Sequence, residues 1–108
     1  MDTVELKHLQ QRISQVPAIL LYFYNDQCAP CIALRPKVIE LMEHTFPKIE
    51  LQMINASGSP DITSAYGVFS SPVILVFFDG KEVFRGSKYI STDELENKIA
   101  RYYSLLFD

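Results

Sequence analysis

The chain has 108 residues, of which 48% are hydrophobic and 21% are charged, and its formal net charge at pH 7 is −3. The length suits one domain of common size, and the composition is that of a globular protein rather than a disordered one. The slightly acidic balance argues against nucleic acid or an anionic membrane as partner, and no apolar run approaches the roughly 18 residues of a membrane span.

The N-terminal segment, MDTVELKHLQQ, lacks the basic stretch and the apolar stretch of a secretory signal. On this basis we expect a cytoplasmic protein. The chain has two cysteines, which are too few for a disulfide scaffold, and the two stand close together. In a reducing compartment a close pair is typical of a catalytic, redox-sensing or metal-binding site.

The first part of the chain predicts a helix followed by a buried strand. Apolar residues recur at helical spacing over about residues 3–15, with Asp2 or Thr3 as the N-cap and Pro17 after the end. Residues 18–24, AILLYFY, form an unbroken apolar run. Such a run is typical of a strand that helices cover on both faces.

A second helix and a second strand are predicted next. Residues 29–43 show helical periodicity, with Pro30 in the first turn, where a missing N–H costs nothing, and Pro36 in the interior. The apolar positions that carry this periodicity are Ile32, Ile39 and Met42. Residues 49–55, IELQMIN, alternate well enough for a strand.

The following segment predicts a short helical turn and a hairpin. The helical turn covers about residues 62–66, and the run VILVFF at residues 73–78 predicts a third strand. The pair Asp79-Gly80 favours a two-residue turn into a fourth, antiparallel strand with the sequence KEVFRG.

A final helix begins with a capping box formed by Ser91 and Glu94. Its inner stripe is expected to contain Leu95, Ile99, Tyr102 or Tyr103, and Leu106. The element order is therefore α-β-α-β-α-β-β-α, with a right-handed parallel crossover first and a hairpin at one edge. Because the sequence shows no linker and no repeat, residues 1–108 are expected to form one α/β domain.

Cys28 and Cys31 lie where the first strand meets the second helix, in the stretch QCAPCI. Free N–H groups and the helix dipole stabilise a thiolate at such a helix start, so the pKa of a cysteine there can fall from about 8.5 to between about 3.5 and 7.5. Cys31, one turn deeper on the same face, can attack a mixed disulfide formed at Cys28. We therefore predict that Cys28 is the exposed nucleophile and Cys31 the resolving thiol.

The segment AILLYFYNDQCAPCIALRPKVIEL resembles the active-site strand and helix of the thioredoxin family, whose usual W-C-G-P-C appears here as Q-C-A-P-C. A second segment, YGVFSSPVILVFFDGKEV, is similar to the tyrosine-glycine turn, cis-proline loop and closing hairpin of that family, and Asn55 also matches. The resemblance covers about residues 18–100. C-x-x-C alone is a modest signal, whereas its combination with Ser-Pro-Val at this spacing is strong.

This resemblance implies a thioredoxin-like fold, with a central mixed sheet of four to five strands and helices on both faces. It also implies an enzyme of thiol–disulfide exchange, and the absence of a secretory signal favours reduction of protein disulfides, with electrons from a reductase or a small thiol. Neither a metal nor an organic cofactor is needed, and we expect a monomer. The Ser71–Pro72 peptide bond is expected to be cis. The residues expected to dock an extended substrate strand are Gln27, Ala29, Pro30, Ser71 and Pro72.

Several positions depart from the family pattern. The family usually has a buried aspartate where this chain has Tyr22, and the lysine that pairs with it corresponds to Met53. The usual tryptophan before the cysteine pair is Gln27, and the usual basic residue after it is Ile32. Because tyrosine ionises near pH ~10, Tyr22 can donate a hydrogen bond to a buried sulfur but cannot accept a proton from Cys31. We hypothesise that Cys31 loses its proton to water or to the departing substrate thiolate.

Other interpretations stay open at this point. A tetrahedral zinc site needs two further ligands, and His8 and His44 are expected on solvated helix faces away from the cysteines, so a metal would have to be shared between two chains. The two cysteines can also be inert core residues. From another functional class, the chain can be a non-catalytic binding or chaperone-like module whose cysteine pair is vestigial or regulatory.

Overall fold

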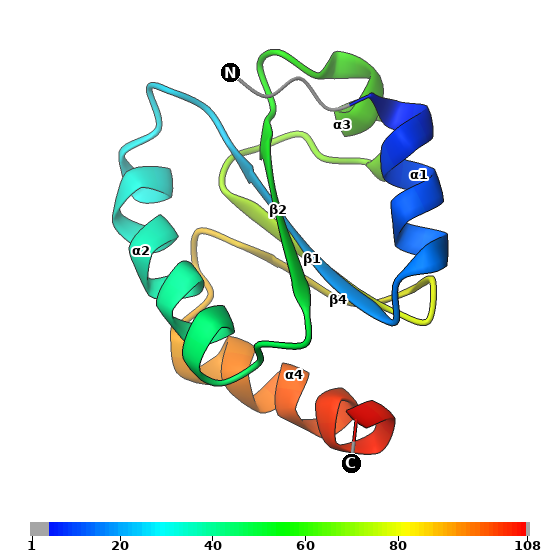
Figure 1. The fold of residues 1–108 in the computed structure, drawn as a ribbon. Helices are drawn as coiled ribbons and strands as arrows, with labels where there is room; N and C mark the ends of the chain where they lie inside the picture. Colours follow the sequence, from blue (N-terminus) through cyan, green and yellow to red (C-terminus); the bar gives the residue numbers. More distant parts are fainter. Residues whose placement is uncertain (1–4, 108) are drawn as a thin grey trace.

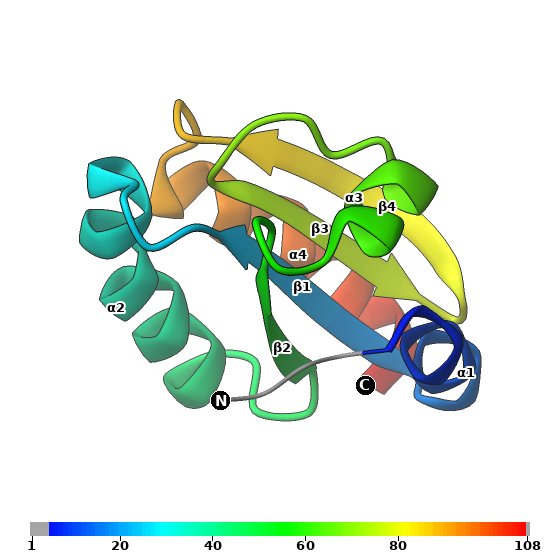
Figure 2. The ribbon, with the colours of Figure 1, turned by 90° about the horizontal axis from the view of Figure 1, so that it is seen from above.

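A four-stranded sheet lies between two pairs of helices in the computed structural model of this protein, which describes residues 5–107 (Figures 1 and 2). The elements in chain order are α1 (Leu6–Gln15), β1 (Ala18–Tyr24), α2 (Ala29–His44), β2 (Glu50–Asn55), α3 (Pro60–Tyr66), β3 (Val73–Phe78), β4 (Lys81–Ser87) and α4 (Thr92–Phe107). Helices α1 and α3 cover one face of the sheet, and α2 and α4 cover the other.

The strand order within the sheet is β2-β1-β3-β4. Strand β1 runs parallel to β2 and antiparallel to β3, and β3 runs antiparallel to β4, so the predicted mixed sheet is confirmed. The predicted parallel crossover is the unit β1–α2–β2. Strands β1 and β3 are central and almost entirely buried, which explains why their sequences are unbroken apolar runs.

The core has two halves, because successive side chains of β1 point to opposite faces of the sheet. Tyr22 belongs to the half under α2 and α4, together with Val38 and Leu95. Phe23 belongs to the half under α1 and α3, together with Leu9. The carboxyl end of β1, where the chain turns into α2, is therefore held between two packed layers.

The predicted elements are present, and their boundaries differ by a few residues. Helix α1 begins at Leu6 with Glu5 as its N-cap, and the side chain of Glu5 makes no capping hydrogen bond. The predicted caps, Asp2 and Thr3, lie outside the described residues. Helix α3 begins at Pro60, earlier than predicted, because a proline fits the first turn of a helix.

Two predicted local motifs are confirmed. Asp79 and Gly80 have φ angles of 55° and 79°, and this left-handed conformation of both residues is what a two-residue hairpin requires. At Gly80 the conformation carries no Cβ penalty. The backbone N–H of Glu94 donates to Oγ of Ser91 at 3.1 Å, as expected for the cap of α4.

One position of the predicted inner stripe of α4 is wrong, and the apolar periodicity of α2 does not coincide with its buried face. Ile32 is 61% exposed, because α2 turns a different set of residues toward the core. The buried residues of α2 are Cys31, Val38 and Met42. Leu106 of α4 is 42% exposed, and Phe107 takes the inward position instead, with its ring centre 4.7 Å from that of Tyr103.

The two long helices, α2 and α4, each contain 16 residues. Pro36 lies in the interior of α2, and the helix continues through it to His44.

Within residues 5–107, no helix is both long enough and apolar enough to cross a membrane.

Candidate active site

Cys28 is the N-cap of α2, at the point where the chain leaves β1. A short turn makes this placement. The backbone N–H of Cys28 donates to the carbonyl of Asn25 at 3.3 Å, and the N–H of Gln27 donates to the side-chain oxygen of Asn25 at 3.0 Å. Pro30 lies in the first turn of α2, where its missing N–H leaves no helical bond unmade. Cys31 follows one turn after Cys28.

Cys28 and Cys31 are joined by a disulfide, and their Cα atoms are 5.2 Å apart. This separation is usual for bridged cysteines, which span about 4.4–6.8 Å. Cys31 is fully buried, and Cys28 is 9% exposed. As predicted, Cys28 lies nearer the surface than Cys31. The description of Cys28 as exposed is wrong, because the loop before β3 packs against it.

The amino end of α2 directs one backbone hydrogen-bond donor at the sulfur of Cys28. The backbone N–H of Cys31 lies 3.2 Å from Sγ of Cys28 and donates to it. The next N–H, that of Ile32, donates to the carbonyl of Cys28 at 3.2 Å. When the disulfide opens, the N–H of Cys31 and the positive end of the helix dipole favour a thiolate at Cys28 over a thiol.

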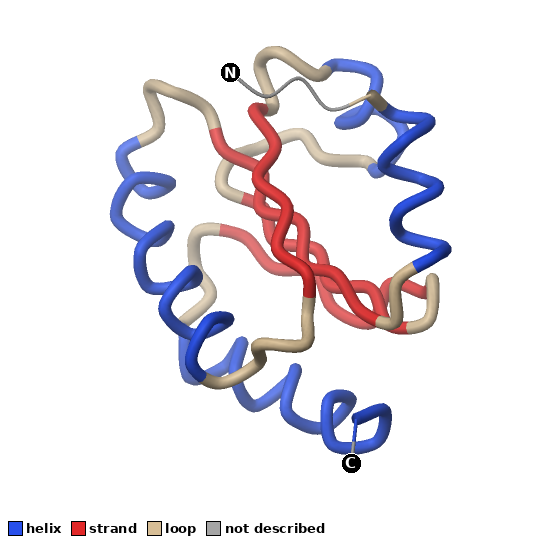
Figure 3. The backbone as a smooth tube through the Cα atoms, viewed as in Figure 1, coloured by secondary structure: helices blue, strands red, loops and turns tan. Residues whose placement is uncertain are grey.

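The loop before β3 comes to the cysteine pair from a distant part of the sequence. Figure 3 shows loops from several parts of the chain at one end of the sheet. Its Ser71–Pro72 peptide bond is cis, as the family resemblance implied. The carbonyl oxygen of Ser71 lies 3.5 Å from Sγ of Cys28, within reach of the thiol that reduction creates. The fold thus brings together Cys28, Cys31 and Ser71, which are up to 43 positions apart in the chain.

The other predicted site residues lie around this centre in different environments. Gln27, Ala29 and Pro30 are exposed beside the cysteine pair, whereas Ser71 is half-buried and Pro72 is buried. An open groove next to Ser71 is lined by residues of three segments. Its lining residues are Asn25, Ala56, Ser57, Thr63, Val68, Phe69, Ser70 and Ser71.

Below the cysteines, Tyr22 and Met53 are opposite each other in the parallel pairing of β1 and β2. Tyr22 is fully buried, and its hydroxyl donates to the carbonyl oxygen of Cys31 at 2.7 Å. The hydroxyl, which the sequence allows to donate to a buried sulfur, instead donates to the backbone of the first turn of α2. Burial raises the pKa of Tyr22 above its usual value, and the positive charge of Arg35 lowers it by a smaller amount.

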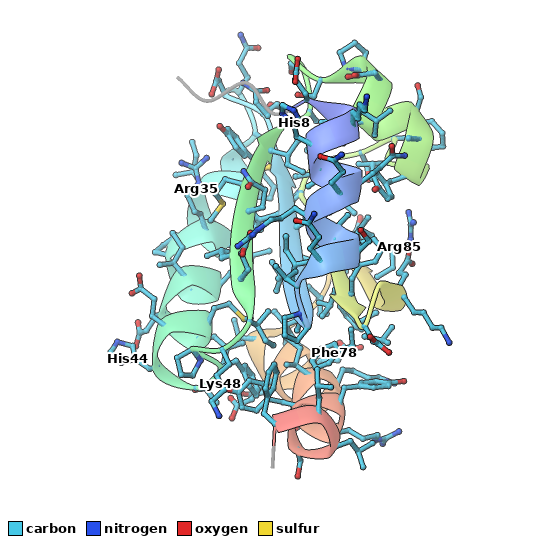
Figure 4. The ribbon with its side chains drawn as sticks, turned by 45° about the vertical axis from the view of Figure 1, so that its right-hand side comes forward. His8, Arg35, His44, Lys48, Phe78 and Arg85 are labelled. Carbon is cyan, nitrogen blue, oxygen red and sulfur yellow. A yellow bond between two sulfur atoms is a disulfide. The ribbon has the colours of Figure 1, made fainter. Side chains whose placement is uncertain are left out.

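Sequence reasoning missed three residues near the site. Arg35 is half-buried, with its guanidinium carbon 4.5 Å from the centre of the Tyr24 ring. Phe69 precedes the cis-proline loop and is 87% exposed. Arg85 of β4 donates to the carbonyls of Gly67 and Tyr66 at 3.2 and 2.8 Å (Figure 4). Of these three, only Arg35 could have been found from the sequence, because it lies one helical turn after Cys31.

The described residues offer no ready metal site. Nowhere in residues 5–107 do three His, Cys, Asp or Glu side chains come close enough together to hold an ion. His8 and His44 are exposed on α1 and α2, as expected, and His8 pairs with Glu5 at 3.0 Å.

Sequence comparison places the chain among known proteins. The family model described as Thioredoxin matches residues 2–101. The chain belongs to the thioredoxin family. A thioredoxin-like protein, YdfQ, of Bacillus subtilis is 31% identical over 100 residues, covering 93% of this chain and 88% of that protein. Thioredoxin of Chlamydia trachomatis is 31% identical over 84 residues, covering 78% of this chain and 81% of that protein.

Solved structures agree with this family assignment. A mutant thioredoxin from Halobacterium salinarum superposes with a TM-score of 0.81 at 30% identity, covering 92% of this chain and 86% of the other. The oxidized form of mitochondrial thioredoxin 3 from Saccharomyces cerevisiae shares the fold, with a TM-score of 0.79 at 23% identity and 89% coverage of both chains.

Family membership and a cysteine pair at bonding distance together identify this thioredoxin-family protein as a thiol–disulfide oxidoreductase. The predicted family, fold and enzyme class are therefore confirmed. The family acts on disulfide-containing protein substrates.

Proposed function

We propose that this protein reduces disulfides of protein substrates, with Cys28 as the nucleophile and Cys31 as the resolving thiol. The observation that carries the proposal is the unequal placement of the two sulfurs. Sγ of Cys28 accepts a helix N–H at the amino end of α2, whereas Cys31 is fully buried one turn further on. A substrate can therefore reach only the first sulfur, and the second is held for the internal step.

The reaction begins with the reduced pair. The thiolate of Cys28 attacks one sulfur of the substrate disulfide, and the other substrate sulfur leaves with the electron pair and takes a proton from water. Cys31, as its thiolate, then attacks Sγ of Cys28. The bond from Cys28 to the substrate breaks, the second substrate thiol is released, and the Cys28–Cys31 disulfide of the structure forms. Two electrons pass to the substrate.

We assign substrate docking to the surface around Cys28. Gln27, Ala29 and Pro30 are exposed on one side of the sulfur, and the cis bond before Pro72 presents the Ser71 backbone on the other. A backbone carbonyl beside the nucleophile can accept an N–H from an extended peptide, as an added strand does. This geometry supports a substrate that binds in an extended conformation.

The proposal includes a partner that restores the reduced pair, either a reductase or a small thiol. We propose that residues 1–108 form one domain, which acts as a monomer. It needs no metal or organic cofactor and binds neither nucleic acid nor a membrane. A cytoplasmic location fits this role, because reductases and small thiols keep cysteines reduced there.

Two serine variants test the roles of the sulfurs with a protein disulfide as the substrate and dithiothreitol as the electron donor. We expect Cys28→Ser to reduce the rate to the background of dithiothreitol alone, because no sulfur remains within reach of the substrate. Cys31→Ser is first reduced and then freed of dithiothreitol, because that dithiol would cleave a mixed disulfide. When the substrate is added, we expect this variant to react once and to stop as a mixed disulfide between Cys28 and the substrate. Mass spectrometry of the unreduced products measures that adduct.

The competing function, a non-catalytic binding module, makes the opposite predictions. In that case the wild-type protein does not accelerate reduction, and Cys28→Ser retains full binding to its partner. A mixed disulfide at Cys31 of Cys28→Ser, with none at Cys28 of Cys31→Ser, would also overturn the proposed roles.

A further inference from the structure

Arg35 lies on α2 one helical turn after Cys31, so the two residues share a face of the helix. Figure 4 shows Arg35 in the amino-terminal half of α2, at the end of the molecule away from His44 and Lys48. Its guanidinium carbon is 4.5 Å from the centre of the Tyr24 ring, close enough for a cation–π contact. Arg35 is therefore held against β1 and is only half-exposed.

The Nε–H of Arg35 is buried without a hydrogen-bond partner among residues 5–107. Buried donors nearly always have an acceptor, so an unpaired one requires an explanation. The structure contains the oxidised pair, in which neither sulfur carries a charge. A guanidinium keeps its proton at every pH at which thiols react, so its positive charge is fixed.

Tyr22 connects this charge to the buried cysteine. Its hydroxyl donates to the carbonyl oxygen of Cys31 at 2.7 Å. The charge of Arg35 also acts on Tyr22, where it opposes the larger effect of burial on the pKa of the hydroxyl. The field of Arg35 therefore reaches a group in direct contact with Cys31.

The elements around Cys31 offer little other charge. Strand β1 contributes the neutral Tyr22, and β2 contributes Met53 opposite it. The core cluster that contains Tyr22 is completed from β3 and α4 by apolar residues such as Ile74 and Leu95. Asp26, in the loop before α2, is exposed. Among residues 5–107 no fully buried side chain is charged, and the half-buried Arg35 is held against the Tyr24 ring at the edge of this layer.

We propose that Arg35 is a positioning residue of the redox centre, whose charge stabilises the thiolate of Cys31 and so speeds the release of reduced substrate. The inference rests on the proposed function. The step it assists is the attack of the Cys31 thiolate on Sγ of Cys28, in which the bond to the substrate breaks and the substrate sulfur leaves with the electron pair and gains a proton from water. The fixed charge of Arg35 lowers the free energy of the Cys31 thiolate. It does not itself accept the proton of Cys31.

Three variants separate charge from structure. Arg35→Met removes the charge and keeps an apolar stem, Arg35→Lys keeps a charge, and Lys37→Met removes a charge from the exposed face of the same helix. The first measurement is the titration of the Cys31 thiol, followed by the ¹³C chemical shift of its Cβ in a Cys28→Ser background. The second is the rate at which a mixed disulfide at Cys28 releases the substrate thiol at pH ~7, close to physiological conditions.

We expect Arg35→Met to raise the pKa of Cys31 by about one unit. The thiolate fraction then falls about tenfold, while the higher basicity raises nucleophilicity about threefold, so release slows roughly three- to fourfold. Arg35→Lys should recover at least half of each change, and Lys37→Met should leave both measurements as in the wild-type protein.

Two results would overturn the role of Arg35. One is an unchanged titration of Cys31 in Arg35→Met. The other is equal changes in Arg35→Lys and Arg35→Met, which would indicate a structural effect of the side chain. Both are distinct from failure of the proposed function, because that failure would appear as a wild-type protein that does not release reduced substrate.

Discussion

Tyr22 of β1 lies directly opposite Met53 of β2, at the two positions where the family resemblance implies an aspartate and a lysine. Both residues that would form a buried acid–base pair are thus replaced by uncharged ones. The core avoids the cost of removing two ions from water. The site has no carboxylate at this position, and the Tyr22 hydroxyl instead holds the first turn of α2 through the carbonyl of Cys31.

The first prediction concerns the stability provided by this hydrogen bond. Tyr22→Phe keeps the ring but leaves the buried carbonyl of Cys31 without its donor, so the free energy of unfolding should fall by about 1–3 kcal/mol. Urea unfolding of the oxidised protein measures the change. Tyr89→Phe, at a position that is 84% exposed, is the matched control and should stay within about 0.5 kcal/mol of the wild type. Equal stabilities of the two variants would contradict the assigned role of the hydroxyl.

The second prediction concerns alkaline pH. Burial raises the pKa of Tyr22 in the folded state, whereas the unfolded chain loses this proton near pH ~10. Above that pH the unfolded state binds fewer protons than the folded state, so stability falls as pH rises, by up to about 1.4 kcal/mol per pH unit. The stability contributed by the neutral Tyr22 hydroxyl is fully present below pH ~10 and is lost as pH rises through the folded-state pKa of Tyr22.

Urea unfolding of the wild type and Tyr22→Phe between about pH 8 and pH 11 tests this point, because other groups titrate alike in both. The wild type should lose stability more steeply above pH ~10, so the difference between the two proteins should narrow there. Parallel profiles would show that Tyr22 ionises as easily in the folded protein as in the unfolded chain.

The third prediction concerns the loop that carries the cis peptide bond. Arg85 holds the end of α3 through the carbonyls of Tyr66 and Gly67, and its Nε donates to Glu82 at 3.0 Å. Arg85→Met removes these bonds, and a loss of about 1 kcal/mol should speed amide exchange of residues 67–71 about fivefold.

Hydrogen exchange with mass spectrometry measures the effect of Arg85→Met. Arg101→Met, on the exposed side of α4, is the control and should leave exchange in the loop unchanged. If exchange in both variants matches the wild type, Arg85 does not restrain the loop.

The fourth prediction concerns Phe69, which is 87% exposed beside the groove next to Ser71. An aromatic ring without core contacts should contribute little to folding, so Phe69→Ala should change stability by less than about 0.5 kcal/mol. If the ring packs against a protein substrate, KM should rise about tenfold, the equivalent of about 1.4 kcal/mol, with kcat nearly unchanged.

Steady-state reduction of a protein disulfide and of a small aromatic disulfide shows whether Phe69 acts in binding protein substrates or in the reaction itself. The small substrate should react equally well with both proteins. Leu105→Ala, at a position that is 81% exposed on α4, should leave KM unchanged for either substrate. A normal KM for the protein substrate in Phe69→Ala would show that this ring does not contact the substrate.

Much of the fold could be predicted from local patterns. The apolar runs of β1 and β3, the turn at Asp79-Gly80 and the cap at Ser91 each express a preference of neighbouring residues. The sequence was a poor guide where the rotation of a helix decides which of its faces is buried. Ile32 fits a helical stripe in sequence, but Cys31 occupies the inward direction. The rotation of α2 depends on what it packs against, which the helical period alone does not contain.

The sequence by itself determined the family, the order of the elements and the position of Cys28 at a helix start, because these depend on motifs and on neighbours along the chain. Only the tertiary structure decided which distant groups surround the sulfurs. The carbonyl of Ser71 beside Cys28, the acceptor chosen by Tyr22 and the unpaired donor of Arg35 all follow from the packing of α2 and the cis-proline loop against the sheet. Hydrogen bonds and charges act over a few ångströms in space, so their partners are set by packing rather than by distance along the chain.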